Sequence, residues 1–80
     1  METSRIHKKL RAVHAILLKA RLLAYEGNDT CRIASMLDDA EFLVSLLISG
    51  RDEPDRFAEH VRGVSGKYSE LSGLAEEYAK

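Results

Sequence analysis

The sequence has little of what usually stabilises a small extracellular or membrane-bound domain. Its 80 residues contain one cysteine, one proline and no tryptophan. A lone cysteine, Cys31, cannot form an intramolecular disulfide, which excludes a disulfide-stabilised secreted fold and makes a reducing cytosol the expected compartment. No apolar run approaches the roughly 20 residues that span a bilayer, and Lys19 and Arg21 interrupt the apolar part of the N-terminal segment. We therefore expect a cytoplasmic protein.

The sequence also has almost no excess of one charge over the other, because 12 Lys and Arg balance 13 Asp and Glu to a formal net charge of -1. A balance so close to neutral gives no overall attraction to nucleic acid or to a membrane surface. The distribution is uneven, however, since residues 3–25 contain six Lys or Arg and no acid. Basic, acid-free amphipathic N-termini are typical of mitochondrial transit peptides. Because the apolar pattern of this segment matches the rest of the chain, we interpret it as part of the fold.

Apolar residues recur at alternating spacings of four and three, which predicts helices that each bury one stripe. We expect helices over about residues 4–26, 30–49 and 54–79, with Gly27 closing the first and Pro54 in the opening turn of the third. The predicted stripe of the first helix is Ile6, Leu10, Val13, Leu17, Ala20 and Ala24. That of the second is Ile33, Leu37, Ala40, Val44 and Leu47. That of the third is Phe57, Val61, Val64, Tyr68, Leu71, Ala75 and Tyr78.

Short connections between helices of similar length favour antiparallel neighbours. The sequence therefore predicts one all-α domain over residues 1–80, a three-helix up-down-up bundle. An alternative is a hairpin of the first two helices, with the third crossing obliquely or docking on a second chain. Gly63 and Gly66 weaken the third helix, so we expect a bend or break near residues 63–66.

The predicted stripes leave other apolar residues without a partner. Leu18, Leu22 and Tyr25 form a second stripe on the first helix, and Phe42 and Leu46 lie opposite the main stripe of the second. One interpretation is that the third helix covers Phe42 and Leu46. The other is that all five form a protein interface, most economically in a two-fold homodimer.

A basic face gives a different hypothesis. Arg5, Lys8, Arg11 and Lys19 lie opposite the main stripe of the first helix, where they are able to contact several phosphates. No aromatic residue is interleaved with them, and no helix-turn-helix pattern follows. Nucleic-acid association is therefore the alternative function.

Chemistry-bearing residues form no convincing site. His7 and His14 are too far apart along one helix to share a metal ion, and His60 is on another. We interpret Asp38, Asp39 and Glu41 as a solvated face or as partners in salt bridges to the first helix, and Cys31 as an inert, half-buried cysteine. We expect no catalytic residue, metal, cofactor or small-molecule substrate. The sequence predicts a non-enzymatic, self-associating protein–protein interaction or regulatory module.

Overall fold

A computed structural model of the protein describes residues 2–27, 29–49 and 54–79, with the side chains of residues 6–27, 29–49 and 56–79. The helices are α1 at Glu2–Tyr25, α2 at Thr30–Ile48, α3 at Pro54–Lys67 and α4 at Leu74–Ala79, with a short 3-10 helix, η1, at Ser69–Leu71. The described residues form no strand, which confirms the all-α prediction. None of these helices combines the length and the apolar character needed to cross a membrane.

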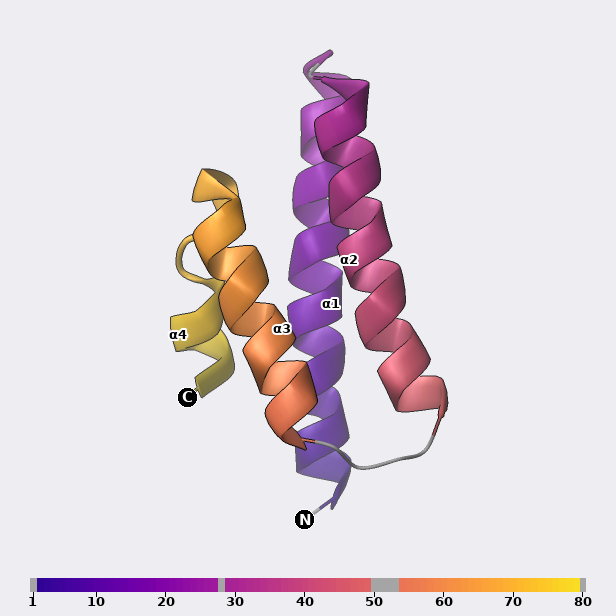
Figure 1. The fold of residues 1–80 in the computed structure, drawn as a ribbon, viewed down its shortest axis with the longest axis vertical. Helices are drawn as coiled ribbons and strands as arrows, with labels where there is room; N and C mark the ends of the chain where they lie inside the picture. The colour runs from indigo at the N-terminus through magenta and orange to yellow at the C-terminus, as the bar shows by residue number, and fades with distance from the viewer. Residues whose placement is uncertain (1, 28, 50–53, 80) are drawn as a thin grey trace.

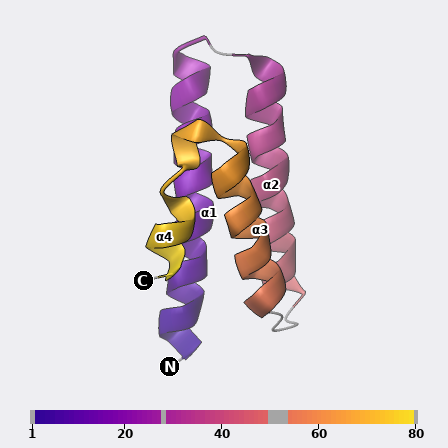
Figure 2. The same cartoon turned by 60° about the vertical axis from the view of Figure 1, so that its left-hand side comes forward.

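α1 and α2 form a long antiparallel hairpin, and α3, η1 and α4 all pack on one face of it (Figure 1, Figure 2). α1, α2 and α3 alternate in direction, as the sequence predicts. The chain then reverses after α3, and α4 runs back beside α1. The predicted bundle of three helices is therefore not confirmed, because four α-helices are present in the described chain.

The turn between α1 and α2 follows from its residues. Gly27 has φ +73°, a left-handed conformation that favours a residue without a Cβ. Asp29 caps α2, because its Oδ1 accepts a hydrogen bond of 2.9 Å from the backbone N–H of Cys31. The predicted helix-closing role of Gly27 is confirmed.

The interruption of the third predicted helix lies just after the expected residues. α3 continues through Gly63 and Gly66 to Lys67, and Tyr68 then takes an extended conformation with φ -118° and ψ 121°. Ser65 holds the returning chain in place, because its hydroxyl donates a hydrogen bond of 2.8 Å to the carbonyl of Ser72. The prediction of a break near residues 63–66 is confirmed, with the helix end just after this range at Lys67, where the side chains of Ser65 and Tyr68 anchor the returning chain.

The core of α1 is rotated from its predicted stripe. The side chains that α1 buries are Lys9, Ala12, Val13, Ile16, Ala20 and Leu23, whereas Ile6, Leu10, Leu17 and Ala24 of the predicted stripe are exposed. α2 is similar, because Met36, Asp39, Ala40 and Leu43 are buried and Leu37 is exposed. η1 and α4 pack on α1, and α3 packs on α2, so that one flank of each stripe is buried and the other stays in solvent. The stripe of the third predicted helix is confirmed, as Phe57, Val61, Val64, Tyr68 and Leu71 are all buried.

This rotation is testable with two neighbouring leucines of α1. Leu23 is 5% exposed and Leu22 is 41% exposed. Leu23→Ala removes a core side chain and is expected to lower the free energy of unfolding by about 2–5 kcal/mol. Leu22→Ala serves as the matched control, with an expected loss below about 1 kcal/mol. Urea unfolding followed by circular dichroism measures both, and equal losses would contradict the observed core.

Candidate functional site

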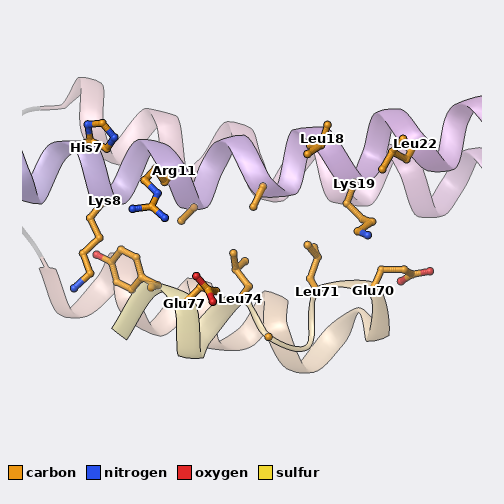
Figure 3. A pocket seen from close by; sticks show the side chains of 14 residues that line it. His7, Lys8, Arg11, Leu18, Lys19, Leu22, Glu70, Leu71, Leu74 and Glu77 are labelled. Carbon is orange, nitrogen blue, oxygen red and sulfur yellow. The ribbon is translucent and has the colours of Figure 1, made fainter. Parts of the chain in front are cut away.

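A groove of about 1070 Å³ runs between α1 and the η1–α4 segment (Figure 3). It exists because the chain reverses after α3, so that α4 lies beside α1 with short side chains between them. The apolar part of the groove is formed by Ala12, Ala15, Leu18, Leu22, Leu71, Leu74 and Tyr78. Grooves of this kind accept an amphipathic segment whose apolar side chains enter between two helices.

The two walls of the groove carry opposite charge. Lys8, Arg11 and Lys19 extend from α1 toward the opposite wall, where Glu70 and Glu77 lie (Figure 3). The Lys8 ammonium also lies 5.5 Å from the centre of the Tyr78 ring, a cation–π contact. A polyanion in the groove would meet two carboxylates together with the cations.

Residues of two separately predicted surfaces line this one groove. Leu18 and Leu22 of the predicted protein interface line the same groove as Lys8, Arg11 and Lys19 of the predicted nucleic-acid face. The side chain of Arg5 lies outside the described residues.

The other predicted interface residues lie elsewhere. Tyr25 is 79% exposed at the end of α1, beside the hairpin turn. Phe42 packs against His60 of α3 with ring centres 4.5 Å apart but remains partly in solvent, and Leu46 is half-buried against the core. The five predicted interface residues therefore do not form one continuous surface.

A second polar feature, the Asp39 cluster, joins α2 to α3 and the turn after it. Oδ2 of Asp39 accepts a hydrogen bond of 2.9 Å from the Tyr68 hydroxyl, which in turn accepts one from Ser35. His60 Nε2 lies 3.2 Å from Oδ1 of Asp39, and Lys67 Nζ lies 3.4 Å from Oδ2. The carboxylate is thus almost enclosed and surrounded by donors, as burial of a charge requires.

The prediction that Asp39 belongs to a solvated acidic face is wrong. Asp39 is buried, while Asp38 and Glu41 are exposed as expected. Helical spacing did contain a signal, because Asp39 lies three and four residues from the buried Met36 and Leu43. A carboxylate at such a position needs partners, and those partners come from α3 and Tyr68, which spacing within α2 does not show.

A second link between α2 and the reversing chain is an ion pair of Arg32 in α2 with Glu70 in η1. Its hydrogen bond lowers the pKa of the Glu70 carboxyl from the usual value of 4.5. The nearby Tyr68 hydroxyl, with the Asp39 carboxylate beside it, raises the pKa of Lys67 above 10.5. These contacts hold the reversing chain on α2.

In the described part of the chain, no three His, Cys, Asp or Glu side chains are close enough together to hold a metal ion. The prediction of a half-buried Cys31 is wrong, because the residue is a free thiol exposed in the first turn of α2, on a side that no other described element covers. The chain matches no family model, and comparison with curated proteins and with solved structures finds no similar protein.

The Asp39 cluster is expected to stabilise the fold. Tyr68→Phe keeps the ring but leaves Asp39 and Ser35 each without one partner, so the free energy of unfolding should fall by about 1–3 kcal/mol. Tyr25→Phe removes a hydroxyl from a side chain that is mostly in solvent and is expected to change it by less than about 0.5 kcal/mol. Urea unfolding of both variants makes the comparison. Equal effects would show that the buried hydroxyl contributes nothing specific.

The Arg32–Glu70 ion pair predicts a pH dependence in acid. Because folding lowers the pKa of Glu70, its contribution is present above the unfolded value near 4.5 and is lost as the pH falls through the folded value. Between pH 6 and pH 3, Glu70→Gln should lose less stability than the wild type. Glu76→Gln, at an exposed position of α4, should follow the wild type. Urea midpoints across this range measure the difference, and parallel curves for all three proteins would contradict it.

Proposed function

We propose that this protein is a non-enzymatic helical interaction module that self-associates through apolar side chains of α1 and α2. One observation carries the proposal. Among the described side chains, every large hydrophobic residue that is exposed belongs to these two helices, and none belongs to α3, η1 or α4. They are Ile6, Leu10, Leu17, Leu18, Leu22, Tyr25, Leu37, Phe42 and Ile48.

The energetic argument follows from the size of the chain. A domain of 80 residues buries a small core, which rarely contributes more than a few kcal/mol of net stability. Each square ångström of apolar surface removed from water adds about 25 cal/mol. Covering several exposed Leu and Ile side chains with another chain therefore supplies stabilisation that the monomer lacks.

A role in nucleic-acid binding has less support. Lys8, Arg11 and Lys19 do lie along one wall of the groove, but Glu70 and Glu77 face them from the other wall. A phosphate backbone would be repelled by these carboxylates. The mixed charge of the groove favours an amphipathic protein segment over a polyanion.

The non-enzymatic part of the proposal is supported by where the titratable groups lie. Asp39, His60 and Tyr68 form the densest cluster of such groups in the described chain, and they are packed between α2 and α3 rather than along the groove. Asp39 is already bonded or paired to Tyr68, His60 and Lys67. Its contacts are those of a structural link between helices.

Self-association is tested by mass in solution. We expect sedimentation equilibrium of the full chain at about 10–100 μM to give twice the 9.0 kDa of one chain, with a monomer fraction that grows on dilution. A single 9.0 kDa species over this range would contradict the proposal.

A further inference from the structure

The exposed part of the predicted stripes points to a specific surface of the hairpin. On α1, Val13 and Ala20 of the stripe are buried, whereas Ile6, Leu10 and Leu17 of the same stripe are exposed. The four- and three-residue spacing of such a stripe is the pattern that packs between helices of a bundle. In the monomer only one flank of this pattern is covered.

The uncovered flanks of α1 and α2 lie on the same side of the hairpin. Leu18 and Leu22 line the groove beside α4, so Leu10 and Leu17 lie on the opposite flank of α1. Similarly, Asp39 and Phe42 of α2 contact α3, which leaves Leu37 and Ile48 on the other flank. No described segment covers that side of the hairpin (Figure 2). We call this surface the open face; it comprises the exposed Ile6, Leu10, Leu17, Leu37 and Ile48 and the half-buried Ile33 and Val44.

The edges of the open face carry opposite charge. Next to the apolar stripe of α1, on its outer side, is Arg21, and next to that of α2 is Glu41. Both side chains are exposed. The edge of α1 thus complements the edge of α2, which is the property that a self-complementary surface needs.

Resting on the proposed self-association, we propose that a second copy of this chain covers the open face, forming a four-helix bundle whose two-fold axis runs parallel to the helices. In this arrangement α1 of one protomer lies beside α2 of its partner and antiparallel to it, as in an up-down four-helix bundle. The apolar stripes of both hairpins meet in the centre. The basic edge of each α1 meets the acidic edge of the α2 across from it.

A two-fold axis perpendicular to the helices would give another dimer, which the charges disfavour. That rotation places α1 against α1 and α2 against α2. Arg21 would then face the basic edge of the partner, and Glu41 its acidic edge. Like charges across an interface oppose association.

The first experiment identifies the face with two adjacent leucines. Leu17 is 43% exposed on the open face, and Leu18 is 38% exposed in the groove. We expect Leu17→Glu to weaken dimerisation at least about tenfold in Kd, because a carboxylate would be buried between apolar stripes. Leu18→Glu should leave the dimer unchanged. Sedimentation equilibrium gives the Kd, and circular dichroism shows that both variants remain helical.

The second experiment determines the orientation by exchanging charges at low salt. Arg21→Glu and Glu41→Arg each place like charges on the facing edges of the two protomers, twice in a two-fold dimer, so each is expected to raise the Kd by about tenfold. A chain carrying both changes restores opposite charges on the facing edges and should dimerise like the wild type. With the perpendicular axis, the double variant would not recover an attraction.

The outcomes separate this inference from the proposed function. A monomeric wild type would overturn both. A dimer that is weakened by Leu18→Glu and not by Leu17→Glu would retain self-association and overturn the open face. Loss of the dimer with Leu17→Glu, but no recovery in the double charge variant, would overturn the proposed orientation.

Discussion

Two long helices that carry apolar side chains on more than one side impose the main constraint on this structure. α1 and α2 pack against each other and must also bury Ile16, Leu23, Met36 and Leu43 against a further layer. α3, η1 and α4 provide that layer on one face of the hairpin only. No described segment covers the other face. The exposed Leu10, Leu17 and Leu37 belong to that uncovered face.

The reversal of the chain after α3 depends on a few polar contacts. Tyr68 has an extended backbone and a buried ring, and its hydroxyl donates a hydrogen bond to Asp39. The hydroxyl of Ser65 donates a hydrogen bond to the carbonyl of Ser72 in the returning chain. Without these anchors, the helix propensities of the last turns offer no reason for α3 to stop at Lys67. The reversal places α4 beside α1 and thereby forms the groove. One buried carboxylate thus determines both the end of a helix and the location of a surface.

The groove and the open face divide the exposed residues of α1 between them. Leu18 and Leu22 share the groove with Lys8, Arg11 and Lys19, so residues that suggest different partners in the sequence belong to one mixed surface. Leu10 and Leu17 belong to the open face, where they adjoin Leu37 of α2. A helix with two apolar flanks is suited to hold neighbours on both sides, which is the behaviour of a helix inside a larger bundle. The open face therefore contains more residues of the stripes predicted for α1 and α2 than the core of the monomer does.

Local physics was enough to predict α1, α2 and the start of α3, but not the separate η1 and α4. Apolar spacing, Gly27 and Pro54 predicted the all-α fold and the position of the hairpin turn, because capping and periodicity act over a few residues. The same spacing was ambiguous about which flank of each stripe is buried, since Ile16 and Leu17 differ by only one step around a helix. That choice depends on α3, η1 and α4, through long-range contacts that no single helix contains. The burial of Asp39, the helix end at Lys67 and the meeting of Leu18 with Lys19 in one groove likewise depend on segments far apart in the chain. Tertiary packing decided them because a buried charge requires partners that only a neighbouring element supplies.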